Sequence, residues 1–112
     1  MRLAKTILVF FALFGVTDFA TAQTWPTRPV RLVVPQSPGG ATDFSARLIA
    51  QQLSGALEQQ VIVENRPGAA GNLGTEAVAR SVPDGHTLLA ALNTTFTVNP
   101  SLYRKLPFDP NA

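Results

Sequence analysis

The sequence predicts an α/β protein that contains the start of a doubly wound parallel sheet, incomplete in this chain. Two observations predict this class. Short runs of β-branched and aliphatic residues alternate with longer segments whose apolar residues recur at helical spacing. Each run is followed by a glycine-rich or polar loop, as expected where parallel strands are joined by right-handed crossovers. The sequence predicts three such strands, about half of an ordinary sheet.

The first 22 residues have the features of an export signal. Two basic residues precede an apolar run over residues 6–16, and Ala20, Thr21 and Ala22 form an A-x-A cleavage site. The apolar run is shorter than the about 20 residues that cross a bilayer. We therefore expect an exported chain that is cleaved after Ala22, with residues 23–112 as the mature protein.

The composition excludes several classes of function. The chain has no cysteine and one histidine, which leaves no thiolate or histidine-rich metal site, so we expect no metal. Nine basic against seven acidic residues give no reason to expect a nucleic-acid partner. At 112 residues the chain is shorter than the roughly 200–250 residues of a barrel enzyme or a two-domain receptor. A small-molecule binder, an incomplete enzyme domain and part of a larger protein remain.

The predicted elements begin with a buried strand over residues 30–34, which Pro35 ends. A helix is expected over residues 43–58, and a second strand over residues 61–63. The inward face of that helix is predicted from five apolar residues at helical spacing: Phe44, Leu48, Ile49, Leu53 and Leu57. A second helix is expected over residues 73–81. Its inward residues are predicted to be Leu73, Ala77 and Val78.

A P-D-G turn over residues 83–85 precedes a third strand, predicted over residues 87–92. His86 in this turn is expected at the surface. Trp25 is expected to pack against the edge of the sheet, with an aromatic lid as the alternative. The polar segment 93–95 follows the third strand. Because the carboxyl ends of parallel strands share one edge, this segment and the two glycine-rich loops should converge on one rim, where ligands bind in such sheets.

The loop after the first strand can bind one carboxylate or phosphate group. Gly39 and Gly40 allow a ligand to approach the main chain, and Thr42 adds a hydroxyl and is expected to be the helix N-cap. The helix start presents unpaired N–H groups. The alternative is a tight turn before a capped helix, with no ligand. The loop matches neither a phosphate-binding P-loop nor the dinucleotide fingerprint, so we expect no nucleotide cofactor.

Arg66, after the second strand, has two interpretations. Its guanidinium pairs with a ligand carboxylate, or it pairs with Glu64 or Glu76 within the protein. Asp43 and Asp84 are better explained by helix and turn chemistry than as catalytic acids.

Four blocks of sequence occur in an order and spacing that resemble a known family. They are WPTRPVRLVVP (25–35) with PGGATD (38–43), VIVENRPGAAGN (61–72), PDGHTLL (83–89), and NPSLY (99–103) with LPFDP (106–110). Together they resemble the N-terminal part of a Bug-type extracytoplasmic solute receptor of tripartite tricarboxylate transporters.

The resemblance implies a lobe like that of type II periplasmic binding proteins, with residues 23–112 as the N-terminal part of lobe 1 of a two-lobed receptor. Such a receptor captures a small carboxylate in the periplasm and delivers it to membrane transporter subunits, without catalysis and without a cofactor. The alternatives are an exported enzyme on the same scaffold and a sensory receptor that docks on a signalling protein.

The resemblance also selects candidate ligand-binding residues. They are Gly39, Gly40, Thr42, Asp43, Asn93 and Thr94. The first four match the family's first ligand-binding loop, whereas the last two are chosen by their position at the end of the third strand. Asp43 is expected to fix the loop rather than touch an anionic ligand, which it would repel.

The chain departs from the family in its length, since the second lobe should lie beyond Ala112. We expect either part of a longer protein or a truncated product. Half a sheet leaves an open edge strand and exposed apolar helix faces, so we expect the isolated chain to be poorly stable.

Overall fold

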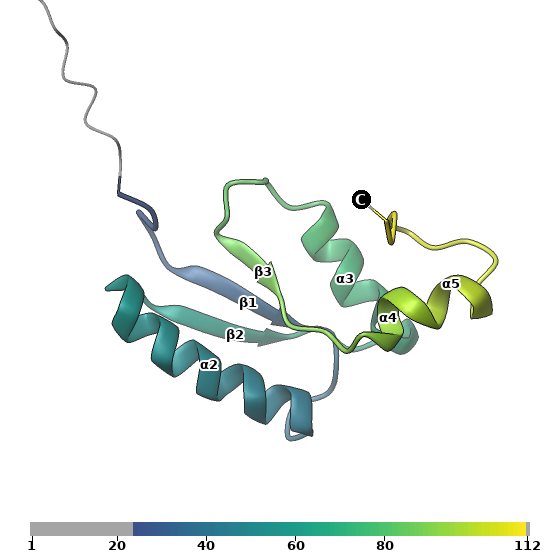
Figure 1. The fold of residues 1–112 in the computed structure, drawn as a ribbon, viewed down its shortest axis with the longest axis horizontal. Helices are drawn as coiled ribbons and strands as arrows, with labels where there is room; N and C mark the ends of the chain where they lie inside the picture. Colours follow the sequence, from purple (N-terminus) through teal and green to yellow (C-terminus); the bar gives the residue numbers. More distant parts are fainter. Residues whose placement is uncertain (1–23, 112) are drawn as a thin grey trace, which may run out of the picture.

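A computed structural model describes residues 24–111, and the predicted signal peptide with its cleavage site lies outside the described residues. Three strands form a parallel sheet in the spatial order β2-β1-β3 (Figure 1). The strands are β1 (Val30–Val34), β2 (Val61–Asn65) and β3 (Thr87–Leu89). The predicted parallel α/β arrangement is confirmed. The third strand ends at Leu89, three residues before the predicted end.

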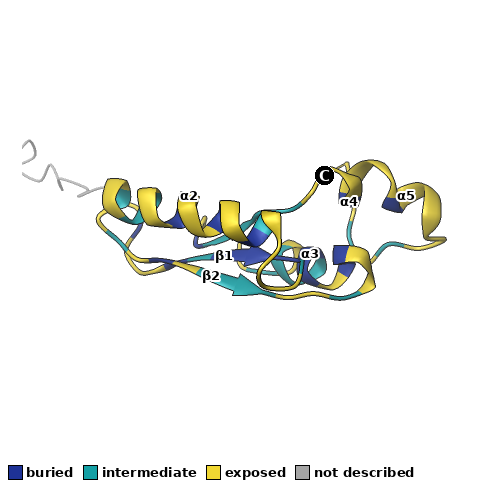
Figure 2. Ribbon diagram, turned by 90° about the horizontal axis from the view of Figure 1, so that it is seen from below, coloured by how far each residue is buried: buried dark blue, intermediate teal, exposed yellow. Residues whose placement is uncertain are grey.

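Helices pack on both faces of this sheet. The helices are α2 (Ala41–Leu57), the 3-10 turn η1 (Ala69–Gly71), α3 (Asn72–Ala79), α4 (Thr94–Thr97) and α5 (Asn99–Leu102). The helix α2 lies along one face, and α3 lies toward the other (Figure 2). This follows from the strand order, because right-handed crossovers to opposite sides of β1 place their helices on opposite faces. Among residues 24–111, no helix is long and apolar enough to cross a membrane.

The core lies around β1, which is the central strand. Val30, Leu32 and Val34 are buried together with Ala46 and Ala50 of α2 and with Val61 of β2. Because β1 is covered on both faces, its sequence is apolar at every position except Arg31 rather than alternating.

The predicted inward face of α2 is wrong for three of its five residues. Phe44 is 66% exposed, Leu48 49% and Ile49 52%. The stripe that faces the sheet is formed by Ala46, Ala50, Leu53 and Leu57. The small alanines let the helix approach β1 closely, and this sets the rotation of the helix about its axis. Phe44, Leu48 and Ile49 then point away from the sheet.

The second helix also differs from its predicted packing. Leu73 is 54% exposed, and the buried residues of α3 are Asn72, Gly74 and Thr75. A Cβ on Gly74 would lie 2.7 Å from Cβ of Pro35 and 2.7 Å from the carbonyl oxygen of Arg66. The close contact between α3 and the end of β1 therefore requires glycine, and it turns Leu73 outward.

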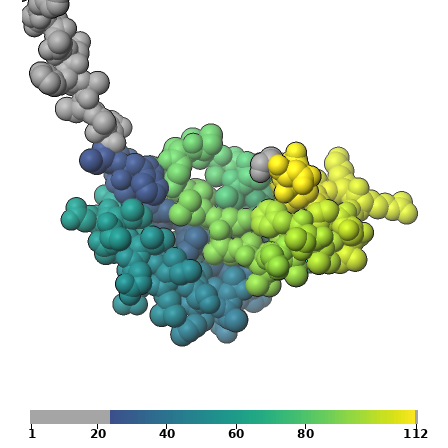
Figure 3. Space-filling view, in the orientation of Figure 1, coloured from purple at the N-terminus to yellow at the C-terminus, as the bar shows by residue number. Residues whose placement is uncertain are grey.

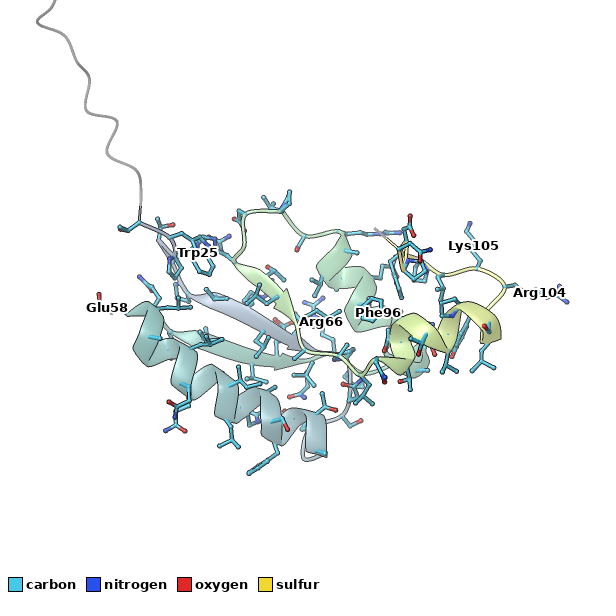
Figure 4. All side chains as sticks on the ribbon, viewed as in Figure 1. Trp25, Glu58, Arg66, Phe96, Arg104 and Lys105 are labelled. Atoms are coloured by element: carbon cyan, nitrogen blue, oxygen red, sulfur yellow. The ribbon has the colours of Figure 1, made fainter. Side chains whose placement is uncertain are left out.

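The prediction that His86 lies at the surface is wrong. Its side chain is buried, and its ring contacts Trp25 edge to face, with ring centroids 5.9 Å apart. The reason lies in Gly85, whose φ is +79°, because a Cβ there would lie 3.1 Å from Nε1 of Trp25. Gly85 therefore lets the Trp25 ring lie over the turn and cover His86. Trp25 and this turn lie at the amino end of the sheet, away from the glycine-rich loops (Figure 4).

Candidate ligand-binding site

The segments that follow the three strands meet at the carboxyl edge of the sheet, as the sequence predicts. The evidence is the surroundings of Gly71, in the loop after β2. A Cβ on Gly71 would lie 3.3 Å from Oγ1 of Thr95, after β3, and 3.6 Å from Nε2 of Gln36, after β1. One rim is therefore built from three segments that are distant in the sequence.

The loop over residues 36–40 leads directly into α2. Gly39 has a φ of +87°, a left-handed conformation that favours glycine, and both Gly39 and Gly40 are exposed. The predicted N-cap is wrong: α2 begins at Ala41 with Gly40 as its N-cap, so the half-buried Thr42 lies inside the first turn. The first turn of a helix presents N–H groups without intrahelical acceptors, together with the positive end of the helix dipole. An anionic group can be bound at this position.

Asp43 holds this loop through hydrogen bonds. It is only 4% exposed. Its Oδ2 accepts the backbone N–H of Gly39 at 2.9 Å and Nε–H of Arg47 at 3.0 Å, and its Oδ1 accepts Nδ2–H of Asn65 at 2.9 Å. These bonds, with that from Arg47 the strongest, lower the pKa of Asp43 to about 2. The carboxylate thus remains ionised and paired at neutral pH.

The loop after β2 has an unusual backbone. Four successive residues, Gly68, Ala69, Ala70 and Gly71, have positive φ values of 136°, 48°, 54° and 89°. Two of them are alanines, for which this region is disfavoured. The loop is held by Asn99, whose Nδ2 donates to the carbonyl of Ala70 at 3.1 Å and to Oδ1 of Asn72 at 2.8 Å. The two asparagine side chains are buried, so they fix the position of this loop at the rim.

The polar segment 93–95, which forms the third side of the rim, differs in detail from the prediction. Asn93 and Thr94 are exposed at the start of α4, whereas Thr95 is 1% exposed and lies against Gly71. Asn93 and Thr94 stay predictions as ligand-binding residues. The sequence predicts that Thr95 lies on the rim, but Thr95 is not among the candidate ligand-binding residues. The only sequence feature that points to it is its place in the same polar segment.

Arg66 forms an ion pair within the protein. Its Nε donates to Oε1 of Glu64 at 2.5 Å, and Arg31 donates to Oε2 of the same carboxylate. The hydrogen bonds from Arg31 and then Arg66 lower the pKa of Glu64. Arg66 lies on the carboxyl side of the sheet (Figure 4). The structure therefore favours the interpretation in which Arg66 pairs with Glu64.

Two surface hollows lie outside this rim. One, of about 380 Å³, lies between the segment 24–26 and the end of α2, and the other, of about 460 Å³, lies between α2 and β2. Neither is lined by Gly39, Gly40 or Thr95. Within residues 24–111, no group of three or more His, Asp or Glu side chains is placed to hold a metal ion.

Curated relatives match nearly the whole of this chain. It is 46% identical to a UPF0065 protein of Bordetella bronchiseptica over 96% of this chain and 32% of that protein. It is 42% identical to the protein BugT of Bordetella pertussis over 96% of this chain and 33% of that protein. The chain spans about a third of the length of these curated relatives.

Solved structures also match this chain over most of its length. MatC from Rhodopseudomonas palustris, with bound malate, superposes with a TM-score of 0.74 at 40% identity, over 78% of this chain and 30% of that one. An R. palustris protein with adipate gives a TM-score of 0.75 at 41% identity, over 79% of this chain and 29% of that one. Residues 45–112 match the family described as the tripartite tricarboxylate transporter family receptor. By this match and its similarity to BugT, the chain belongs to the tripartite tricarboxylate transporter receptors, as a Bug-type member.

Proposed function

We propose that residues 23–112 form the N-terminal part of lobe 1 of a two-lobed periplasmic receptor that captures a small carboxylate. The receptor delivers this solute to the membrane subunits of a tripartite tricarboxylate transporter. Residues 1–22 serve as the signal peptide, which is removed after Ala22. Family membership and the malate and adipate bound by solved relatives support this proposal.

The observation that carries the proposal is the convergence of three loops beside the start of α2. Exposed glycines and a helix N-terminus lie on one side, and the asparagine-held loop and Thr95 lie on the other. Both carboxylate oxygens of Asp43, the acid within this site, accept hydrogen bonds from Arg47, Gly39 and Asn65. The ligand-binding residues are then the main chain of Gly39 and Gly40 and the hydroxyl of Thr42, with Asn93 and Thr94 as further candidates.

We infer a binding protein rather than an enzyme. The chain's one histidine, His86, is buried against Trp25 at the other end of the sheet from the glycine loops. It is therefore not available as a general base at the rim. The reported relatives with bound ligands hold small acids, which fits capture and release.

The test is calorimetric titration of the protein encoded by the native gene with small carboxylates, from succinate, malate and adipate to citrate, glutamate and benzoate. At least one acid should bind, whereas its methyl ester should not. Gly40→Glu places a negative charge at the site, and because the φ of Gly40 is −83° and a Cβ there meets only the carbonyl oxygen of Ser37 at 3.8 Å, the side chain fits without strain. We expect this variant to weaken binding about tenfold or more, since like charges near a protein surface repel strongly.

Gly55→Glu is the matched control. It adds the same charge to α2 at a position where a Cβ meets nothing within 4 Å, near the other end of the helix. Its affinity should equal that of the wild type. Failure of every acid to bind would refute carboxylate capture. If the Gly40→Glu variant binds as tightly as the wild type, the ligand site does not lie at this loop.

A further inference from the structure

Three side chains form a closed hydrogen-bonded group beside the loop over residues 36–40. Asp43, Arg47 and Asn65 are named here the loop-holding group. Arg47 donates from Nη2 to Oδ1 of Asn65 at 3.1 Å and from Nε to Oδ2 of Asp43 at 3.0 Å. Asn65 donates from Nδ2 to Oδ1 of Asp43 at 2.9 Å. Each member therefore contacts both of the others.

Asn65 links both ends of the loop to the sheet. Its Nδ2 also donates to the backbone carbonyl of Gln36 at 3.2 Å, where the loop begins. At the loop's other end, Gly39 donates its N–H to Asp43, which Asn65 contacts. Asn65 is itself the last residue of β2 and pairs in register with Val34 of β1. The position of the loop is therefore fixed relative to the two strands.

The group also balances charge. A carboxylate next to an anion-binding loop would repel a carboxylate ligand. Here the guanidinium of Arg47 supplies the compensating charge, and both oxygens of Asp43 accept hydrogen bonds. The carboxylate can therefore stiffen the loop with little repulsion of an anion bound at its exposed glycines.

We propose that Arg47 and Asn65 are positioning residues of the carboxylate site, which hold the loop over residues 36–40 against β2 and compensate the charge of Asp43. They act through the loop and do not touch the ligand. This inference rests on the proposed function and adds to it two residues outside the candidate ligand-binding set.

The decisive variant is Asn65→Asp, which keeps the shape of the side chain but replaces the Nδ2 donor by an oxygen that faces Asp43. Two carboxyl groups in contact cannot both ionise without cost, so the introduced carboxyl takes up a proton as the pH falls and then donates to Asp43 again. At pH 7.5 we expect binding of the best wild-type ligand to weaken about tenfold or more, as expected when a charge-assisted hydrogen bond is lost. The ratio of variant to wild-type Kd should fall toward one as the pH is lowered to about 5.

Two further measurements separate positioning from general damage. Gln60→Glu adds the same charge just before the other end of β2, and its Kd should match that of the wild type at every pH. Amide exchange in the ligand-free protein should be faster at Gly39 in the Asn65→Asp variant, by about tenfold at neutral pH, and return toward the wild-type rate at low pH.

The outcomes discriminate between the two proposals. If the wild type binds a carboxylate and Asn65→Asp binds it equally well, or is weakened by the same factor at every pH, the positioning role is wrong and the receptor function stands. An equal effect of Gln60→Glu would also refute the positioning role. If the wild type binds no carboxylate, the proposed function fails, and the inference fails with it.

Discussion

At the scale of single residues, the acid of the first loop dominates the electrostatics of the site. Asp43 has a pKa of about 2 against an ordinary 3.8, because Arg47, Gly39 and Asn65 donate hydrogen bonds to it. A carboxyl whose pKa is lowered by folding stabilises the native state above its unfolded pKa. That contribution disappears as the pH falls through the folded value.

We therefore expect Asp43→Asn to lower the Tm at neutral pH, since the introduced amide cannot accept all three hydrogen bonds. The Tm difference from the wild type should shrink as the pH falls from about 4 to about 2, where the wild-type carboxyl itself becomes protonated. Thermal unfolding followed by circular dichroism across this range measures it. Glu64 and Asp84 also have lowered pKa values, but they are present in both proteins and cancel in the difference. A difference that does not change with pH would contradict this account.

Thr42 gives a second prediction at this scale. It lies within the first turn of α2 and is not the N-cap, so its hydroxyl is available to a ligand. Thr42→Val should weaken ligand binding by about 1–3 kcal/mol if the hydroxyl contacts the ligand. The Tm should change little. Thr27→Val, at an exposed threonine outside the site, is the control. An unchanged Kd would remove Thr42 from the set of ligand contacts.

The residues that sequence reasoning found and missed differ in kind. Gly39 and Gly40 could be selected as candidates because the conformation of their loop follows from local backbone freedom, as the positive φ of Gly39 shows. Asn65 and Gln36 were not selected as site residues, because each acts through a contact between segments some thirty residues apart, as in the 3.2 Å bond that joins them. No local sequence pattern predicts such a pair, because the two residues come together only in the folded protein.

At the scale of elements, the same distinction separates the strands from the helices. The run over residues 30–34 was predicted with correct bounds, since a strand covered on both faces is recognisable from composition alone. The face of α2 was mispredicted because the helical spacing of the large apolar residues was taken as the guide, whereas the distance of approach to β1 is set by Ala46 and Ala50. Close packing of small residues thus decided the rotation of the helix.

The glycines of α2 and α3 give an opposed pair of predictions. Gly74→Ala should destabilise the protein by about 1–3 kcal/mol, because the added Cβ would overlap Pro35 and the Arg66 carbonyl, both at 2.7 Å. Gly55→Ala should stabilise it by up to about 1 kcal/mol, because its Cβ meets nothing and alanine favours a helix. Urea denaturation of the two variants measures both effects. A neutral Gly74→Ala variant would show that α3 is free to move away from β1.

At the scale of the whole molecule, the described residues leave much apolar surface uncovered. The outer face of α2 carries Phe44, Leu48 and Ile49, and in the space-filling view this helix lies at the surface with no other segment over it (Figure 3). The sheet also has a free edge at β2, only partly protected where the hydroxyl of Ser54 accepts the N–H of Val61 at 2.9 Å. Exposed apolar faces and open edges favour association between copies.

The segment over residues 24–111, expressed alone, should therefore unfold at low urea concentration and aggregate. Its buried core is small and centred on β1, and the remaining apolar surface favours self-association. Replacing Phe44 by Ser together with Leu48 and Ile49 by Gln should raise its solubility without lowering the urea midpoint, since these side chains face away from the sheet. Leu53→Gln, on the stripe that packs against the core, should instead abolish cooperative unfolding. Sedimentation and urea titration measure both properties. A soluble wild-type segment with a sharp two-state transition, and a slope in the range of about 1–3 kcal/mol/M for a domain of this size, would show that the three strands and their helices are sufficient for a stable fold.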